Sequence, residues 1–210
     1  MNQKRSSLTI GVLGFQGDVE EHVSSIQTGL AKTSQEGRVL LVKERKDLSQ
    51  IHALVIPGGE STVIGGMLAL RSMVKDLSEK MIQGLPILGT CAGLILLAKR
   101  VYDRVVGDTN QPLLGVLDVL VERNAFGRQR QSFQADFDIP KYGLTGYDGT
   151  FIRSPLIKEV GPHVDVLAKL DDHAIAVQQG TILATTFHPE LSRNSIFHEE
   201  LIKMASSRTL

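Results

Sequence analysis

The sequence lacks the features that mark several classes of protein. Among its 210 residues there is one cysteine, Cys91, so no disulfide can form within the chain and no cysteine cluster can bind a metal. Lysine plus arginine and aspartate plus glutamate both total 23, so no overall charge attracts nucleic acid, an anionic membrane or an acidic substrate. The residues therefore give no sign of a metal centre or a nucleic-acid partner.

Long hydrophobic runs are also missing. None approaches the roughly 20 apolar residues that a membrane-spanning helix needs. The polar start, Met1 to Ser7, lacks the apolar stretch of a secretory signal peptide. We therefore expect a soluble, cytoplasmic protein that does not act at a membrane.

The composition that is present is typical of one globular domain. Hydrophobic residues make up 42% of the chain and charged residues 22%, close to the averages for soluble proteins. The length suits one large core better than two small ones. We expect a single domain over residues 1–210, with residues 1–7 forming a flexible N-terminal extension.

The first half alternates between strand-like and helix-like segments. Apolar, partly β-branched runs predict strands over residues 8–13, 39–42, 53–56 and 87–88. Helical spacing of apolar residues predicts helices over 18–32, over 64–81 with a weak point at Gly65-Gly66, and from Ala92 to about Arg100. Such alternation predicts an α/β fold whose mainly parallel central sheet is flanked by helices.

The alternation of predicted strands and helices ends after Leu113. Strand-like segments over 116–123, 132–139 and 149–153 follow without long helices between them. Residues 174–178 and 182–186 predict a hairpin, and an amphipathic helix closes the chain after Ile196. We expect the C-terminal half to add antiparallel strands to the domain.

The single cysteine lies in a catalytic setting. Gly89-Thr90-Cys91-Ala92-Gly93 has the Gly-x-nucleophile-x-Gly form between an apolar strand and an apolar helix. The glycines permit the sharp turn of a nucleophile elbow, and the following helix start favours a thiolate. Without this context, a lone cysteine is more often a small buried hydrophobic residue. The context predicts that Cys91 is a nucleophile and that the Ala92 N–H faces an oxyanion.

A thiol nucleophile needs a base, and the base needs an orienting group. His188 follows the end of a predicted strand, Pro189 stiffens the turn, and Glu190 is placed to hold the imidazole. The alternative is a loop histidine beside an unrelated glutamate. No role is expected for the other histidines, which are His22, His52, His163, His173 and His198.

A glycine-rich turn supplies a third element. Pro57-Gly58-Gly59-Glu60-Ser61 ends a predicted strand and opens a helix, and its glycines can aim N–H groups at a negative atom. A simple turn with Ser61 as helix cap is the alternative. Neither a phosphate-binding loop nor a dinucleotide fingerprint is present. The short basic segment Arg128-Gln129-Arg130 is too weak to predict nucleic-acid binding.

Oxyanion loop, nucleophile and base with its orienting acid follow one another in an order that resembles the class I, or triad, glutamine amidotransferases. A resemblance to the glutaminase subunits of pyridoxal 5′-phosphate synthase covers almost the whole chain. Its most specific parts are Glu122-Arg123-Asn124 and Phe151-Ile152-Arg153. The segments that carry it are residues 11–17, 57–62, 89–94, 121–127, 151–155 and 187–191.

The resemblance implies a role for each matched residue. Cys91 is the nucleophile, His188 the general base and acid, and Glu190 the orienting group of a triad that hydrolyses glutamine to glutamate and ammonia through a thioester. The implied oxyanion hole comprises Gly58, Gly59 and Ala92. The implied glutamine-binding residues are Gly59, Glu60, Ser61, Arg123, Ile152 and Arg153. No metal or organic cofactor is implied.

The resemblance also implies a partner. In that family, ammonia passes to a (β/α)₈-barrel synthase subunit within a large hetero-oligomer, which builds pyridoxal 5′-phosphate from ribose 5-phosphate and glyceraldehyde 3-phosphate. Two alternatives stay open, a glutaminase of another pathway such as imidazole glycerol phosphate synthesis and a non-catalytic redox or stress protein on the same fold. Asp18 and Glu20 depart from the family pattern, and we expect them to affect partner contacts more than chemistry.

Overall fold

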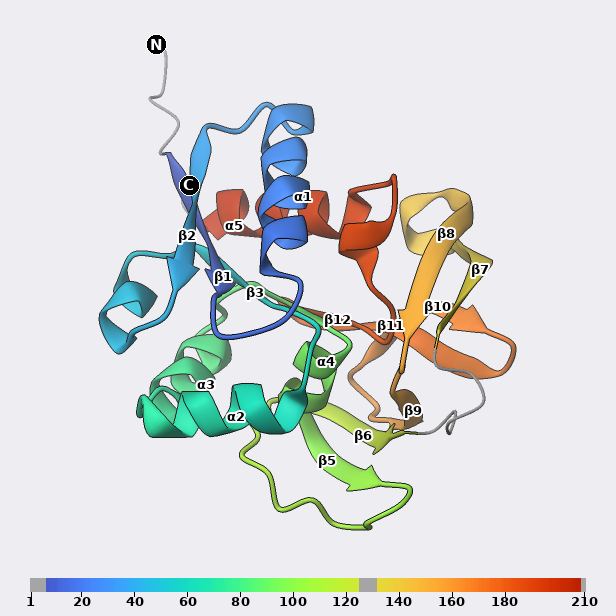
Figure 1. Ribbon diagram of the computed structural model, residues 1–210. Coiled ribbons are helices and arrows are strands. Elements are labelled where there is room, and N and C mark those ends of the chain that lie inside the picture. Colours follow the sequence, from blue (N-terminus) through green and yellow to red (C-terminus); the bar gives the residue numbers. More distant parts are fainter. Residues whose placement is uncertain (1–6, 125–131, 209–210) are drawn as a thin grey trace.

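The computed structural model describes residues 7–124 and 132–208, and at its centre lies a seven-stranded sheet (Figure 1). The strand order is β10-β11-β12-β4-β3-β1-β2. The strands from β12 to β2 are parallel, whereas β11 and β10 pair in antiparallel fashion. Their bounds are β1 Leu8–Leu13, β2 Gly37–Val42, β3 Ala53–Ile56, β4 Ile87–Thr90, β10 Asp165–Leu170, β11 His173–Gln179 and β12 Ile182–Thr185. The predicted α/β class with a mainly parallel sheet is confirmed.

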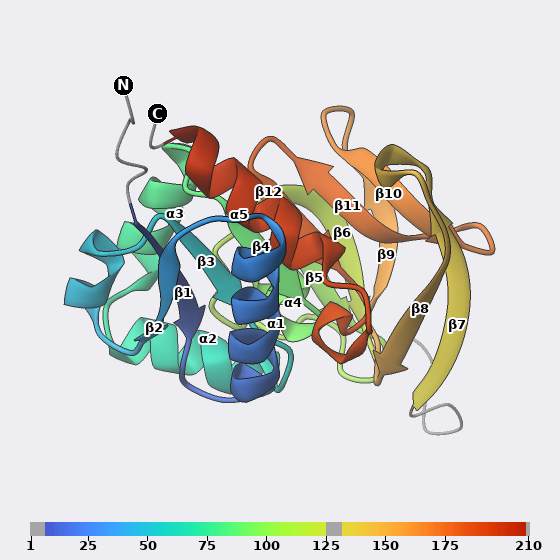
Figure 2. The same cartoon turned by 90° about the horizontal axis from the view of Figure 1, so that it is seen from above.

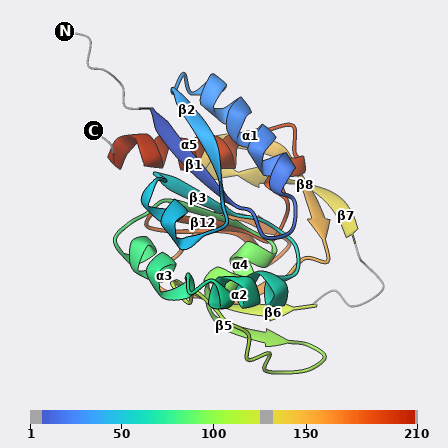
Figure 3. The same ribbon diagram turned by 60° about the vertical axis from the view of Figure 1, so that its left-hand side comes forward.

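Helices cover both faces of this sheet (Figure 3). α1 and α5 pack together on one face and share a hydrophobic cluster with β1 and β3. α2, α3 and α4 lie on the other face and contribute to a second cluster. The bounds are α1 Val19–Lys32, α2 Ser61–Leu70, α3 Val74–Ile82, α4 Ala92–Leu97 and α5 Ile196–Arg208.

Two smaller sheets extend the layers. β5, β6 and β9 form a three-stranded sheet on the side of α4, and β7 and β8 form an antiparallel pair beside β10 (Figure 2). The aromatic side chains of β7 and β8 pack against Phe187 and Phe197. The bounds are β5 Ala98–Asp103, β6 Leu117–Arg123, β7 Ser132–Ile139, β8 Leu144–Ile152 and β9 Leu156–Val160. The added antiparallel strands of the second half are therefore also confirmed.

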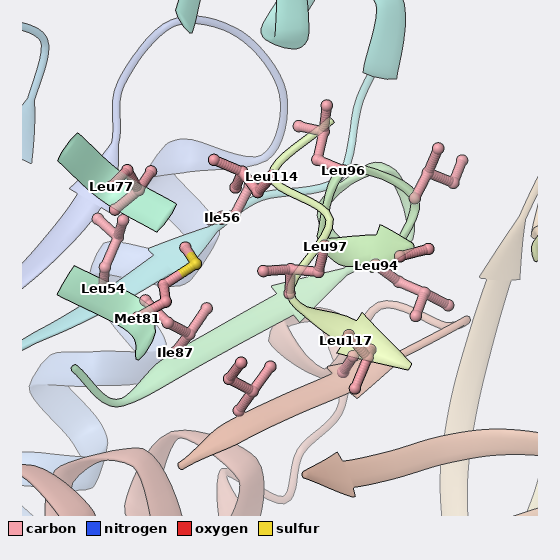
Figure 4. Packing of buried hydrophobic residues seen from close by; sticks show 14 of the residues in the cluster. Leu54, Ile56, Leu77, Met81, Ile87, Leu94, Leu96, Leu97, Leu114 and Leu117 are labelled. Carbon is pink, nitrogen blue, oxygen red and sulfur yellow. The ribbon is translucent and has the colours of Figure 1, made fainter. Parts of the chain in front are cut away.

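Packing fixes the short helix that follows the nucleophile. α4 has only six residues, too few to be stable alone. Leu94, Leu96 and Leu97 are completely buried, and Figure 4 shows them among the side chains of Ile56 and Leu117. Burial of each such leucine contributes about 1.5–3 kcal/mol. The core therefore holds α4 and the turn in front of it in place.

The prediction of one helix over residues 64–81 is wrong. Two helices, α2 and α3, occupy this segment, and the break falls at Ser72, whose φ is +54°, instead of at Gly65-Gly66. A side chain at Gly65 would place its Cβ 2.7 Å from the carbonyl oxygen of Pro112. Gly65 therefore serves a close approach between α2 and a neighbouring segment, which local helix propensity does not reveal.

The prediction that the helix after Cys91 reaches about Arg100 is also wrong. α4 ends at Leu97, and Ala98–Asp103 continues as β5, paired in parallel with β6. The strands β9 and β10 were not predicted. β10 has an irregular register against β11, and such irregularity obscures the alternation of apolar and polar residues by which a strand is recognised.

Some expectations concern residues outside the described ranges. Of the predicted extension over residues 1–7, only Ser7 is among the described residues. The basic segment Arg128-Gln129-Arg130 lies within 125–131, which is also outside the described ranges. Among the residues described, no helix has the length and apolar character required to cross a membrane.

Candidate active site

Four neighbouring strands bring the candidate site together. β12, β4, β3 and β1 are adjacent and parallel, so the segments that follow them emerge at the same edge of the sheet. Cys91 follows β4, Gly58 and Gly59 follow β3, and His188 lies just after β12. Asp18 lies after β1. The topology thus gathers parts that are separated by up to 170 residues in the chain (188 minus 18).

Cys91 has the strained backbone of a nucleophile elbow. Its φ of 49° and ψ of −99° are unusual for a side-chain-bearing residue, and strain of this kind costs on the order of 1–3 kcal/mol. A Cβ on Gly89 would lie 2.4 Å from Leu97 Cδ1, and one on Gly93 would lie 2.2 Å from the Ile56 carbonyl oxygen. Both flanking glycines are therefore required by close packing of strand and helix, as the motif predicts.

The thiol of Cys91 lies close to the backbone of β8. Sγ is 3.7 Å from the carbonyl oxygen of Ile152, and the Cys91 N–H donates to the Thr185 carbonyl at 2.8 Å. The residue is only 6% exposed. A substrate must therefore reach Sγ through the cavity described below.

His188 and Glu190 form the expected pair. Nδ1 of His188 lies 2.7 Å from Oε1 of Glu190, and both side chains are buried. Nε2 of His188 has no hydrogen-bond partner among the described residues. A ring held through Nδ1 leaves Nε2 available to exchange a proton with a reacting group.

Asp18 is a second carboxylate at the same ring nitrogen. Its Oδ2 lies 3.1 Å from Nδ1 of His188, and the side chain is 37% exposed. The expectation that Asp18 affects partner contacts more than chemistry is therefore corrected, because Asp18 contacts the candidate base directly. The residues around position 18 gave no signal for this contact, which arises because the segments after β1 and β12 emerge at the same edge of the sheet.

These contacts set the charge of His188. Burial opposes the imidazolium, but hydrogen bonding to the carboxylates of Asp18 and Glu190, together with the nearby Cys91 side chain, outweighs burial and raises the pKa of His188 well above its ordinary value. Burial likewise raises the pKa of Glu190, which the contact with His188 counteracts. Hydrogen bonding to His188 lowers the pKa of Asp18. The arrangement favours an imidazolium between two carboxylates.

A cavity of about 240 Å³ opens at this edge of the sheet. This is smaller than the roughly 300–1,000 Å³ typical of sites for drug-sized ligands and suits a single amino acid. Gln16, Gly17 and Asp18, which the sequence did not assign to the site, contribute to its wall. Residues assigned from the sequence that line it are Gly59, Glu60, Ser61, Cys91, Arg123, Ile152, Arg153 and His188.

Three assigned residues do not line the cavity. Glu190 lies behind His188, and Ala92 is buried at the start of α4. Gly58 packs against the imidazole, since a Cβ there would lie 2.4 Å from His188 Cε1. Backbone N–H groups, not side chains, are what Gly58, Gly59 and Ala92 would offer an oxyanion.

The two arginines differ in their surroundings. Arg123 is 13% exposed and donates to Glu60 Oε1 at 2.9 Å and to Gln111 Oε1 at 2.8 Å. Arg153 is exposed, has a φ of +42°, and makes no hydrogen bond or ion pair with the described residues. Arg123 therefore braces the glycine-rich turn, whereas Arg153 presents an unpaired cation at the cavity.

A first loop is tied to the glycine-rich turn. The Glu60 N–H donates to Oε1 of Gln16 at 2.8 Å, and Gly59 has a φ of +136°. A Cβ on Gly17 would lie 1.7 Å from the carbonyl oxygen of Gly58. Together with the Asp18–His188 contact, this means that the loop after β1 touches both the turn and the candidate base.

One group of side chains has the composition of a metal site. Ligand atoms of Asp18, His188 and Glu190 lie within 4.8 Å of one another. Nδ1 of His188 is already within hydrogen-bond distance of Glu190, at 2.7 Å. A proton held between the imidazole and the carboxylate therefore explains why these three side chains lie together.

Two histidines without an expected role lie directly behind the site. His22 and His198 are completely buried, and Nε2 of His22 lies 3.3 Å from Oε2 of Glu190. Their helical positions in the sequence gave no reason to single them out. A buried position for His22 could have been read only from its spacing to Ile26 on the inner face of α1.

Comparison with known proteins agrees with this geometry. A model described as the SNO glutamine amidotransferase family matches residues 12–207. The chain is 43% identical over 198 residues to the protein "Pyridoxal 5'-phosphate synthase subunit PdxT" of Nitrosopumilus maritimus (strain SCM1), a match that covers 94% of this chain and 97% of that protein. It is also 43% identical to the protein of the same name from Sulfurisphaera tokodaii, with 94% and 99% covered.

Solved structures show the same fold. One described as a glutamine amidotransferase has a TM-score of 0.81 and 40% sequence identity, covering 93% of this chain and 98% of its own. A glutamine amidotransferase from Thermotoga maritima has a TM-score of 0.61 at 12% identity, covers 98% of this chain and 86% of its own, and supports the fold alone.

Proposed function

The chain belongs to the SNO glutamine amidotransferase family, and from this premise we propose that Cys91, His188 and Glu190 hydrolyse glutamine and supply the ammonia to pyridoxal 5′-phosphate synthesis. One observation carries the assignment of residues. A strained cysteine and an imidazole held by a buried carboxylate at 2.7 Å line the same cavity. Such a pairing of nucleophile, base and orienting group is what acyl transfer requires.

The reaction begins when the Cys91 thiolate attacks the side-chain amide carbon of glutamine. A carbon–sulfur bond forms, and His188 donates its proton to the departing nitrogen, which leaves as ammonia. His188 then takes a proton from water, whose oxygen attacks the thioester carbon. The carbon–sulfur bond breaks, which releases glutamate and restores the Cys91 thiolate beside the protonated His188.

An oxyanion forms in both halves of this cycle. The Ala92 N–H and an N–H of the Gly58-Gly59 turn are the proposed donors, since both follow strand ends beside Cys91. Removing one donor of this kind typically costs about 2.7–4 kcal/mol of transition-state stabilisation. The glycine-rich turn thus completes a site that the triad alone does not provide.

The cavity offers a cation for the α-carboxylate of glutamine. Arg153 has no partner among the described residues, whereas Arg123 is already bound to Glu60. An arginine can bind a carboxylate through two parallel hydrogen bonds. We therefore assign direct substrate contact to Arg153 and support of the Glu60 segment to Arg123.

Arg153→Ala is expected to raise KM for glutamine by about 10- to 100-fold, the range for losing a hydrogen bond to a charged group. Labelling of Cys91 by a small neutral alkylator should change little. Arg123→Ala should raise KM less, through disorder of the turn. Steady-state assays measure both, with Arg71→Ala as a control because Arg71 is exposed and does not line the cavity. Unchanged KM in Arg153→Ala would contradict the assignment.

Asp18→Asn is expected to shift the pH profile of glutamine hydrolysis. Hydrogen bonding to Asp18 contributes to the raised pKa of His188, so loss of the carboxylate lowers this pKa. His188 must be protonated to release ammonia, and its proton is then lost at lower pH. The alkaline limb of kcat/KM should therefore move to lower pH. Glu20→Gln removes a similar charge from an exposed side chain nearby and should leave the profile in place.

The names of the relatives support a proposal for the partner protein. Proteins of 43% identity are named as subunits of pyridoxal 5′-phosphate synthase, and we propose that this chain delivers ammonia to such a synthase, a (β/α)₈-barrel subunit in a large hetero-oligomer. The experiment is to mix the purified chain with the synthase subunit and to measure pyridoxal 5′-phosphate formed with glutamine as the nitrogen source. Formation only with added ammonium salt would contradict the proposal.

The two alternatives predict different outcomes in the same assay. A glutaminase of imidazole glycerol phosphate synthesis would release ammonia but would support only its own synthase. A redox or stress protein would release no ammonia from glutamine with either partner. Pull-down with each synthase then separates the two pathways.

A further inference from the structure

Two buried histidines form a row behind the triad that the proposed mechanism does not use. His22 lies on α1 and His198 on α5, and both are completely buried. Nδ1 of His22 lies 2.9 Å from Nε2 of His198, and Nε2 of His22 lies 3.3 Å from Oε2 of Glu190. Buried imidazoles without a structural or catalytic use are uncommon, because an unpaired polar group costs free energy in the core.

His22 reaches both sides of the candidate site. Besides Glu190 Oε2, its Nε2 lies 3.2 Å from Oγ1 of Thr90, the residue before Cys91. Oε2 of Glu190 is buried and makes no hydrogen bond with the described residues, and Nε2 of His22 approaches it to 3.3 Å. One ring nitrogen therefore faces the second oxygen of the orienting carboxylate and the neighbour of the nucleophile.

The contacts select one tautomer for each ring. If Nε2 of His22 carried a lone pair, it would face the Glu190 carboxylate and repel it, so Nε2 carries the proton. Nδ1 of His22 is then an acceptor, and Nε2–H of His198 donates to it. Nδ1 of His198 has no partner among the described residues. In this tautomer it carries a lone pair, and an unpaired buried N–H at the same position would cost more free energy.

Both rings stay neutral in this row. Burial, together with the charges of His198 and His188, lowers the pKa of His22 well below its ordinary value, and burial lowers the pKa of His198 to about 3. The groups that face His22 are Glu190 and His188 after β12, His198 on α5, and Thr90 on β4. A neutral N–H can approach Oε2 of Glu190 without competing with the imidazolium of His188 for the negative charge of the carboxylate.

We propose that His22, oriented by His198, is a positioning residue whose Nε2–H, 3.3 Å from Oε2 in the free protein, closes to a hydrogen bond with Glu190 in the working site and thereby holds this carboxylate against His188. The proposal rests on the proposed glutaminase function. A carboxylate with one unsatisfied, buried oxygen is free to turn away from the imidazole or to take up a proton. His22 prevents both, and the triad becomes a row of five side chains, from Cys91 to His198.

The test compares two substitutions of His22. His22→Gln can place its amide N–H where Nε2 lies, whereas His22→Leu has similar volume and no donor. We expect His22→Leu to lower kcat by about 10- to 100-fold, the range for losing a hydrogen bond to a charged group. KM should stay within about twofold, since no contact with the substrate cavity is lost, and His22→Gln should recover most of kcat.

The pH profile provides a readout that a merely structural role would not change. With Glu190 less firmly held, the pKa of His188 falls, so the alkaline limb of kcat/KM should move to lower pH in His22→Leu and return in His22→Gln. His198→Leu should act in the same direction more weakly. Equal kcat and equal profiles for His22→Leu and wild type, with wild type active, would overturn the proposal. An inactive wild type would instead overturn the glutaminase function.

A second measurement does not depend on the folding of a variant. Nitrogen-15 NMR of histidine-labelled wild-type protein reports tautomer and charge at each ring. We expect two neutral rings protonated at Nε2, assigned to His22 and His198 by correlating each ring with its own backbone amide in the wild-type protein, and unchanged between pH 6 and pH 8. A His22 ring protonated at Nδ1, or charged in this range, would overturn the proposal.

Discussion

Cys91→Ala is expected to abolish glutamine hydrolysis, with a loss on the order of 10⁴-fold or more, as is usual when the nucleophile of a cooperating set is removed. The physical reason is that no thioester can form without the Cys91 sulfur, and His188 and the oxyanion donors do not provide another nucleophile. Ammonia release from glutamine, measured with the synthase present so that the site is complete, is the assay. Significant ammonia release by the pure variant would contradict the assignment of Cys91.

The fold of this variant should remain intact. The small side chain of Cys91 is buried beside Ile152, and alanine fills most of its space. Alanine also has the same difficulty with a φ of 49° as cysteine, so the strain of the elbow does not change. A loss of about 1 kcal/mol would lower Tm by only roughly 2–4 °C for a domain of this size. Circular dichroism on heating checks this.

Covalent labelling tests the same residue independently. Cys91 is the only cysteine in the chain, so thiol chemistry can occur at no other cysteine. An electrophilic analogue of glutamine should add to Cys91, and Arg153→Ala should slow this reaction more than that of a neutral alkylator. An adduct found by mass spectrometry at another residue would count against the nucleophile.

Local sequence was sufficient to predict several parts of the site. The elbow around Cys91 and the pair His188–Glu190 lie within a few residues, so their geometry follows from one turn each. β1 and β3 were predicted with their observed bounds, Leu8–Leu13 and Ala53–Ile56, because buried parallel strands are short continuous apolar runs.

Contacts between distant segments could not be predicted in this way. Asp18 and His22 meet the triad only because β1 lies two strands from β4, and α1 packs on α5. A histidine in a polar helix is ordinarily exposed, whereas His22 is completely buried on the face of α1 that packs on α5. The failure to predict β5 has a similar origin, since Ala98–Asp103 is a strand because β6 pairs with it.

The geometry of the first loop suggests how a partner controls turnover. Gln16 accepts the Glu60 N–H at 2.8 Å, Gly17 contacts the Gly58 carbonyl, and Asp18 contacts His188. Gln16 and Gly17 are exposed in the isolated chain. A protein that docks on this loop would therefore act on a segment that contacts both the glycine-rich turn and the candidate base, without touching Cys91.

The isolated chain is accordingly expected to be a poor glutaminase that the synthase activates. Adjacent glycines at positions 58 and 59 can change peptide orientation at little steric cost, so the turn can present or withdraw an oxyanion donor. One missing donor costs about 10²–10³ in rate.

Steady-state ammonia release should rise at least tenfold on adding the synthase, mainly in kcat, because docking shifts the population toward the complete oxyanion hole. Gln16→Ala, which frees the Glu60 N–H, should reduce this activation, whereas Lys75→Ala, on the exposed part of α3, should not. Equal kcat with and without a synthase that demonstrably binds would refute control through this loop and would leave the assignment of the triad unaffected.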